Sequence, residues 1–183
     1  MPNWCYNRLV IQGDAADRRE FETWNRGFGP PCACAPDQLL LDLPAAVLDA
    51  PPLRHLTFDA LLPVPAEVAA GGGDAESEWR LAQWGTSGNP TAETEVMDDG
   101  ATLTYVFQTP WSPPQEWVIA VATRFPDLAI TLEFAEPTGI FAGSMTVAGA
   151  KICEYQTTDI VEDVATLMME WFGWDPYAWD ETA

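Results

Sequence analysis

The chain has 183 residues, of which 48% are apolar and nine are Trp, so its composition is that of a folded domain rather than of a disordered segment. It carries 28 Asp and Glu against 8 Lys and Arg, and residues 61–183 alone hold twenty carboxylates and three basic residues, a net charge of −17. This charge disfavours nucleic-acid phosphates and anionic membrane surfaces as direct partners, and it favours a basic protein.

The first predicted element is a strand. Its residues alternate, with Cys5, Leu9 and Ile11 on one face and Trp4, Tyr6, Arg8 and Val10 on the other. Because Asn3, Asn7 and Arg8 interrupt the apolar residues, the opening does not read as a secretory signal, and no later stretch approaches the roughly 18 apolar residues of a membrane span. We therefore expect a soluble protein of the cytoplasm with no membrane partner.

A helix is predicted next, because Asp14 can cap it and Phe21, Trp24 and Phe28 recur at helical spacing. The triple glycine at 71–73 is followed by acidic residues instead of the Gly-Lys-Ser/Thr of a phosphate loop. It indicates a break before another helix, with Asp74 as the predicted cap and Trp79 on the buried side.

Between these helices lies a Pro-rich, irregular insertion at about 29–55, which contains Cys32 and Cys34. Their C-x-C spacing is one residue short of the hook used in zinc sites, so loop or buried thiols are favoured over a metal site. A strand is expected within 54–65, with Leu56 and Phe58 on one side.

Residues 93–111 read as a hairpin around Asp99-Gly100, a dipeptide that suits a tight turn, with one face of the second strand buried. The helix that follows is predicted to have Ser112 as its N-cap and Gln115 completing a capping box. Its apolar stripe comprises Trp117, Val118, Val121, Ala122 and Phe125.

Residues 129–155 supply two or three further strands, the first with Ile130, Leu132 and Phe134 on one face. The last helix has apolar positions at Ile160, Val161, Val164, Leu167, Met168, Trp171 and Phe172. Half-buried strands interspersed with helices indicate an α+β fold, an antiparallel sheet with helices packed on one face. We expect one such domain over 1–158, and an acidic helix and tail over 159–183 that pack on it or extend from it.

Candidate catalytic and metal sites are weak. The only histidine, His55, has no recognisable nucleophile motif, so a solvent-facing or hydrogen-bonded imidazole is favoured over a hydrolytic triad. Close carboxylate pairs could bind a divalent cation or act as acid and base, but they are expected by chance among 28 carboxylates, and a solvated acidic face is favoured. No cofactor is predicted.

Several tryptophans adjoin turns, where an aromatic either covers the core or anchors a partner. Trp111 is expected to cover the core, and both interpretations stay open for Trp84. The tail aromatics Trp174, Tyr177 and Trp179 are interleaved with acidic residues, so we expect them to dock on the body or on a partner.

The stretches PNWCYNRLVIQG, LTFDALLPVP, WRLAQWGT, YVFQTPWSPP and the run ending in TGIFAG span most of residues 1–145 in order. Together they resemble the Api92-like proteins, a ferredoxin-like family of phages, prophages and plasmids. The resemblance implies a ferredoxin-like sheet and a mobile-element origin, and it implies no catalytic residues.

Two departures from that family's pattern stand out. Its usual WGTKW is here Trp84-Gly85-Thr86-Ser87-Gly88, so any ligand contact made by the Lys and Trp in relatives is lost or altered. The acidic end beyond Lys151 reads as an addition particular to this member.

These features favour a non-enzymatic, acidic protein of a phage or mobile element that acts as a DNA mimic. It would inhibit a nucleic-acid-binding defence protein of the host bacterium, for example a CRISPR effector, by occupying its basic groove. The alternatives are a small ligand- or metal-binding ferredoxin-like domain or enzyme, and a structural protein whose acidity only keeps it in solution. The residues predicted to bind the partner are Trp84, Glu93, Glu95, Asp98, Asp99, Glu162, Asp163, Glu170, Asp175, Trp179, Asp180 and Glu181.

Overall fold

The computed structural model describes residues 3–28, 53–91, 93–136, 138, 140–149 and 151–174. Most of the insertion predicted at about 29–55, including Cys32 and Cys34, lies outside these ranges. The tail with Tyr177 also lies outside them, and so do four of the residues predicted to bind a partner, namely Asp175, Trp179, Asp180 and Glu181.

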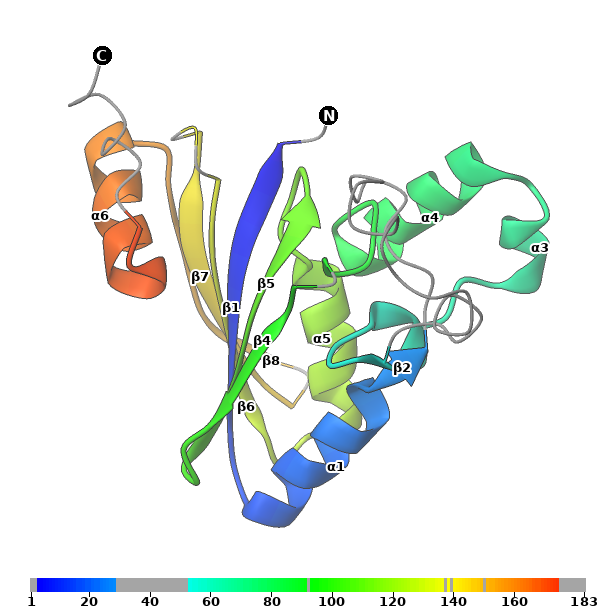
Figure 1. The fold of residues 1–183 in the computed structure, drawn as a ribbon, viewed down its shortest axis with the longest axis horizontal. Coiled ribbons are helices and arrows are strands. Elements are labelled where there is room, and N and C mark those ends of the chain that lie inside the picture. Colours follow the sequence, from blue (N-terminus) through cyan, green and yellow to red (C-terminus); the bar gives the residue numbers. More distant parts are fainter. Residues whose placement is uncertain are drawn as a thin grey trace, which may run out of the picture.

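In these ranges the chain forms eight strands, five α-helices and one short 3-10 helix (Figure 1). The strands are β1 (Trp4–Gln12), β2 (Gly27–Phe28), β3 (Leu53–Arg54), β4 (Glu95–Asp98), β5 (Thr102–Pro110), β6 (Ala129–Ala135), β7 (Ala142–Ala148) and β8 (Lys151–Thr158). The helices are α1 (Ala15–Asn25), η2 (Phe58–Ala60, the 3-10 helix), α3 (Ala66–Ala69), α4 (Gly73–Trp84), α5 (Gln115–Arg124) and α6 (Val161–Phe172).

Six strands form one antiparallel sheet in the order β4-β5-β1-β6-β7-β8. The strands β1 and β4, linked through α1, enclose β5, while β5 and β6, linked through α5, enclose β1. Two such split β-α-β units make up the ferredoxin-like arrangement, which β7 and β8 extend at one edge. The predicted α+β, ferredoxin-like sheet is therefore confirmed.

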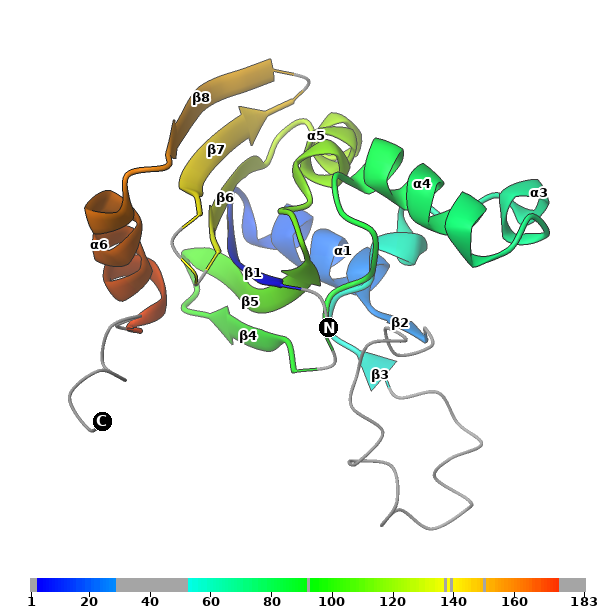
Figure 2. The same ribbon diagram turned by 90° about the horizontal axis from the view of Figure 1, so that it is seen from above.

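The helices lie on both faces of this sheet. The helices α1, α4 and α5 lie together on one face, which we name the helical face, and α6 lies alone on the other, which we name the open face (Figures 1 and 2). The expectation that helices cover one face of the sheet holds for these three, and α6, which was expected to pack on this domain or to extend from it, packs on the other face.

The central strand β1 confirms its predicted alternation. Cys5, Leu9 and Ile11 are fully buried towards the helical face, together with Asn7, whereas the residues between them are half-buried on the open face. The Asn7 amide donates to the Cys5 carbonyl oxygen at 2.9 Å and to Thr109 Oγ1 at 2.8 Å, so this polar side chain is satisfied inside the core.

The strand predicted within 54–65 is wrong beyond Arg54, which ends β3. The residues that follow pack into the core of the helical face without forming a strand. Leu56 and Phe58 are both buried, but Phe58 begins the 3-10 helix η2. Its backbone N–H donates to Asn89 Oδ1 at 2.9 Å, and its carbonyl oxygen accepts from Trp117 Nε1 at 3.3 Å. Because side chains satisfy this backbone, the segment needs no neighbouring strand.

Two predicted helix caps are wrong, whereas Asp14 does cap α1 by accepting from the Ala16 N–H at 2.8 Å. The N-cap of α4 is Gly72, and Asp74 lies in its first turn. The N-cap of α5 is Pro114, because the Ser112 hydroxyl donates instead to the Gly85 carbonyl oxygen at 2.6 Å.

Three apolar residues depart from the pattern predicted for the helices. Phe28 belongs to β2, beyond the end of α1, and Trp24 is 46% exposed beneath the Arg124 guanidinium, 4.3 Å from its ring centroid. Ile160 precedes α6 and is 55% exposed. The hairpin with its left-handed Gly100, the buried face of β5 and the apolar stripe of α5 are all confirmed.

Candidate functional site

The open face is a polar surface that crosses all six strands. Directly paired residues share a face, so the pairings place Glu95, Val106, Arg8, Glu133, Ser144 and Gln156 in one row from β4 to β8. The next row contains Met97, Thr104, Val10, Thr131, Thr146 and Glu154. This face therefore offers hydroxyl, amide and carboxylate groups together with a few apolar side chains, among them the exposed Met97.

Few cations offset the carboxylates of this surface. Arg8 pairs with Glu133 at 2.6 Å, and the other two ion pairs of the described residues, Arg26–Glu22 and Arg80–Glu76, lie in or beside helices of the helical face. Arg18 is buried and donates to two backbone carbonyl oxygens, of Gly13 and Gly100. Lys151, at the start of β8 opposite Ala148, is exposed and forms no ion pair within the described ranges.

The helix α6 is held on the open face by a second, smaller core. Val164 and Met168 are buried against Ala135 and Ala142 of the sheet. Tyr6 of β1 adds an aromatic ring to this core. Its ring lies edge-on to Phe172 and is stacked on Trp174, with centroid distances of 5.8 and 5.7 Å. Trp174, expected to dock on the body or on a partner, thus docks on the body.

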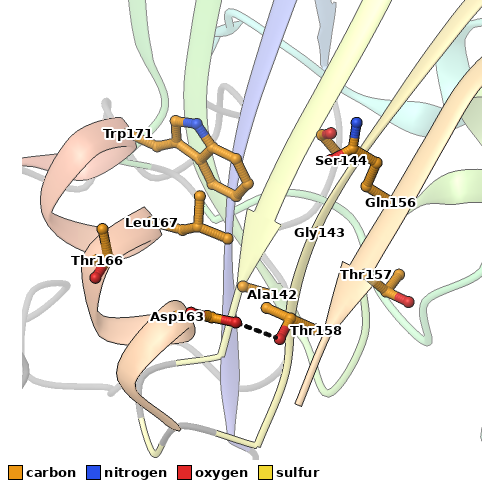
Figure 3. A pocket seen from close by; sticks show the side chains of 10 residues that line it. All are labelled: Ala142, Gly143, Ser144, Gln156, Thr157, Thr158, Asp163, Thr166, Leu167 and Trp171. Carbon is orange, nitrogen blue, oxygen red and sulfur yellow. Dashed lines mark hydrogen bonds between the residues drawn. The ribbon is translucent and has the colours of Figure 1, made fainter. Parts of the chain in front are cut away.

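A pocket of about 270 Å³ lies between α6 and the strands β7 and β8 (Figure 3). We name it the α6 pocket. Its lining comprises Ala142, Gly143, Ser144, Gln156, Thr157 and Thr158 from the strands, and Asp163, Thr166, Leu167 and Trp171 from the helix.

The lining of the α6 pocket combines an apolar wall with one charged group. Leu167 and Trp171 point from the helix towards the strands, while Ser144 and Gln156 lie on the strand side (Figure 3). At one end the Thr158 hydroxyl donates to Asp163 Oδ2 at 3.3 Å, which joins the two walls. Asp163 is the only charged residue that lines the pocket.

Sequence reasoning missed this pocket, although one signal for it was present. Asp163, Leu167 and Trp171 follow one another at intervals of four, so they share one face of a helix. The hydroxyl and amide groups of β7 and β8 that complete the lining carry no such signal.

The predicted partner-binding carboxylates all lie at the surface where they are described. Glu93, Glu95, Asp98 and Asp99 are exposed on β4 and its flanking turns, and Glu162, Asp163 and Glu170 are exposed on α6. No described cation forms an ion pair with any of these seven.

Asp99 has a structural role as well. The backbone N–H groups of Thr102 and Ala101, and then the Thr102 hydroxyl, hold the pKa of the Asp99 carboxyl below its ordinary value. The N–H···O distances to Asp99 Oδ1 are 2.6 Å from Thr102 and 2.8 Å from Ala101. This carboxylate fastens the turn of the hairpin.

Of the two tryptophans that adjoin turns, Trp84 is buried and Trp111 is exposed. Trp84 is fully buried, and its indole N–H donates to the Leu62 carbonyl oxygen at 3.0 Å, so it is not a partner-binding residue. Trp111 is 56% exposed and adopts a left-handed φ of 67°, so its expected place over the core is wrong. The chain turns at Trp111, where its backbone N–H donates to the Asn3 carbonyl oxygen and its ring is directed outwards.

The candidate catalytic and metal-binding groups are dispersed. His55 is exposed, as predicted. Burial raises the pKa of the Cys5 thiol, and the buried Glu136 carboxylate raises it further, so this cysteine is a protonated thiol rather than a nucleophilic thiolate. In the described part of the chain no three His, Cys, Asp or Glu side chains converge on a metal position.

None of the helices within the described ranges is long and apolar enough to span a membrane.

A comparison of the sequence with protein families covers the part of this fold from residue 86 onwards. The family model described as the ferredoxin-like domain in Api92-like protein matches residues 86–180, which is more than half of the chain. The chain belongs to the Api92-like family. No curated protein matches it.

A solved structure extends the agreement to the whole fold. The crystal structure of a protein api92 from Yersinia pseudotuberculosis superposes with a TM-score of 0.63 over 86% of this chain and 98% of that chain. Sequence identity is 10%, so the likeness to this structure is one of fold.

Membership of the Api92-like family corrects one expectation. The acidic end beyond Lys151 was expected to be an addition, but the family domain runs to residue 180 and includes β8 and α6. The α6 pocket lies wholly within that domain.

The signature Trp84-Gly85-Thr86, by contrast, has a packing role: a Cβ on Gly85 would lie 2.9 Å from the Pro113 carbonyl oxygen, and Thr86 donates to the Pro110 carbonyl oxygen.

Proposed function

We propose that the chain is a non-enzymatic protein of a phage or another mobile element that binds a basic, nucleic-acid-binding protein in the cytoplasm of the host bacterium. Its acidic open face would occupy the groove in which that protein binds nucleic acid, and so act as a DNA mimic. A CRISPR effector or another defence nuclease is the class of target that fits this chemistry.

The observation that carries the proposal is that most of the described cations are paired or buried, whereas the exposed carboxylates of β4 and α6 are not. Of the seven cations whose side chains are described, three form ion pairs, Arg18 is buried and Arg124 lies over a tryptophan ring, which leaves Arg19 and Lys151 exposed without a carboxylate partner. The exposed carboxylates of β4 and α6 have no such partners. Unpaired surface charge of one sign speeds encounter with a surface of the opposite sign.

Two properties of the described residues support binding without catalysis. The buried thiol of Cys5 is held protonated, and the exposed imidazole of His55 has no hydrogen-bond partner among the described residues. Neither group has the oriented base or acid that nucleophilic catalysis needs.

The test uses the whole chain, immobilised and exposed to a nuclease-treated bacterial lysate, with elution by rising NaCl or by added double-stranded DNA. The test variant removes five charges near the open face, and the matched control removes five charges from the helices of the helical face. The test variant carries Glu93→Gln, Glu95→Gln, Glu154→Gln, Glu162→Gln and Glu170→Gln; the control carries Glu20→Gln, Glu67→Gln, Asp74→Asn, Glu78→Gln and Glu116→Gln.

We expect nucleic-acid-binding proteins to be retained by the wild type and the control, to be lost from the test variant, and to elute with DNA. Because both variants have the same net charge, equal losses would assign binding to bulk acidity and contradict the proposal. Retention that neither salt nor DNA reverses would contradict it too.

A further inference from the structure

We propose that the α6 pocket receives an arginine side chain of the basic partner. The inference rests on the proposed function and names the chemistry at the centre of the contact.

The size of the pocket suits one side chain. Cavities that enclose drug-sized ligands measure about 300–1,000 Å³, and the α6 pocket at about 270 Å³ is smaller. Interfaces are commonly anchored by single Arg, Tyr or Trp side chains that insert into such pockets.

The charge of the pocket selects a cation. Asp163 is its only charged lining residue, and no lysine or arginine is among the ten residues that line it. Thr158 donates to Oδ2 of this carboxylate, while no described group donates to Oδ1, which is left to accept from a ligand. An anionic ligand would meet this carboxylate and a chain of net charge −20.

The other lining groups favour a guanidinium over an ammonium. Trp171 is half-buried and supplies an indole ring about two helical turns beyond Asp163. A guanidinium is planar, so it can stack on an indole ring while its N–H groups pair with a carboxylate. Ser144 and Gln156 add a hydroxyl and an amide on the strand side, which can accept its remaining N–H groups.

The proposed class of partner supplies such a side chain. Proteins that bind nucleic acid present arginines to phosphates, and the same fork of N–H groups fits a carboxylate in the same bidentate manner. An arginine that normally contacts DNA would therefore find Asp163 in place of a phosphate.

The experiment measures binding of two capped decapeptides, of ten arginines and of ten lysines, to the whole chain by calorimetry. Both peptides carry the same charge, so generic attraction is common to them. The pocket variants are Asp163→Asn and Trp171→Leu. Their controls are Glu162→Gln, which removes one charge from the neighbouring position of α6, and Trp111→Leu, which removes an exposed indole elsewhere.

We expect the wild type to prefer the arginine peptide. Asp163→Asn should weaken its binding about tenfold or more and abolish the preference, because a charge-assisted pair in a pocket is lost. Glu162→Gln should weaken both peptides alike, by at most about fivefold, as for an exposed charge. Trp171→Leu should reduce the preference, and Trp111→Leu should leave it intact.

Three results would overturn the inference. Equal effects of Asp163→Asn and Glu162→Gln would show generic charge attraction, which leaves the proposed function standing. Equal affinity of the wild type for the two peptides would do the same. Failure of both peptides to bind at low salt would overturn the pocket and the proposed function together.

Discussion

The two faces of the sheet bury side chains to different extents, and they differ in what remains exposed. On the helical face, Phe58, Trp84 and Trp117 pack ring against ring, with centroids of neighbouring rings 4.6 and 5.5 Å apart, in one continuous core. On the open face, the core beneath α6 consists of Val164, Met168 and two alanines. Stability is therefore concentrated on one face, which leaves the other face free to carry polar groups, charge and a pocket.

The family signature belongs to the first of these regions. Trp84, Gly85 and Thr86 connect α4 to the start of α5 and to the end of β5. A signature made of packing residues identifies a fold without marking a binding site. The surface that we propose to bind a partner lies on the opposite side of the sheet.

The largest expected effect is that of Trp84→Ala, which removes a fully buried indole and leaves the Leu62 carbonyl oxygen without its donor. We expect the free energy of unfolding to fall by about 3–5 kcal/mol. Trp111→Ala, at the exposed tryptophan, should change it by no more than about 0.5 kcal/mol. Urea unfolding followed by circular dichroism compares the two variants. Similar losses of unfolding free energy would contradict the expected difference between the buried and the exposed tryptophan.

Next in size is Met168→Ala, which empties the centre of the small core beneath α6. We expect a loss of about 2–3 kcal/mol that is confined to α6. Hydrogen exchange of the amides of 161–172 should quicken while that of β1 and β5 stays unchanged. Faster exchange in all of these elements would show that the two faces unfold as one unit.

A smaller effect is expected from Arg8→Gln, which removes the only arginine of the open-face row and leaves Glu133 without its ion pair. The free energy of unfolding should fall by about 0.5–1 kcal/mol. Affinity for the arginine decapeptide should nevertheless rise, by about twofold, because the face becomes more acidic. A lower affinity of this variant for the arginine decapeptide would show that the peptide does not bind at the open face.

The smallest effect concerns Asp99 and pH. The folded pKa of this carboxyl lies below its ordinary value of 3.8, so its contribution is complete above that value and is lost as the pH falls through the folded pKa. The stability difference between wild type and Asp99→Asn should be constant from pH 7 to about 5 and shrink below about 4. A difference that grows on acidification would contradict this sign.

Local patterns predicted much of the fold because their signals lie within a few residues. The alternation in β1 and the Asp99-Gly100 turn are examples, and each is set by strand and turn geometry. Tertiary contacts overrode the remaining predictions. Ser112 has the sequence of a helix cap, yet its hydroxyl donates to the carbonyl oxygen of Gly85, 27 positions away.

The candidate site was only partly predictable for the same reason. The exposed carboxylates of β4 and α6 were identified from composition and spacing. The pocket requires that α6 cross to the open face and stand beside Ser144 and Gln156, a juxtaposition produced by the small core around Met168. Trp111 was assigned incorrectly and both interpretations of Trp84 stayed open, because a tryptophan beside a turn has the same sequence context whether it faces the core or the solvent.

Hydrogen exchange of the whole chain with and without the arginine decapeptide tests the central claim most directly, because it compares the acidic segments of both faces at once. The account predicts slower exchange in 142–149 and 151–172, which line the α6 pocket, and no change in α4, although Asp74, Glu76 and Glu78 make its first turns equally acidic. Equal protection of α4 and α6, or protection of neither, would contradict it.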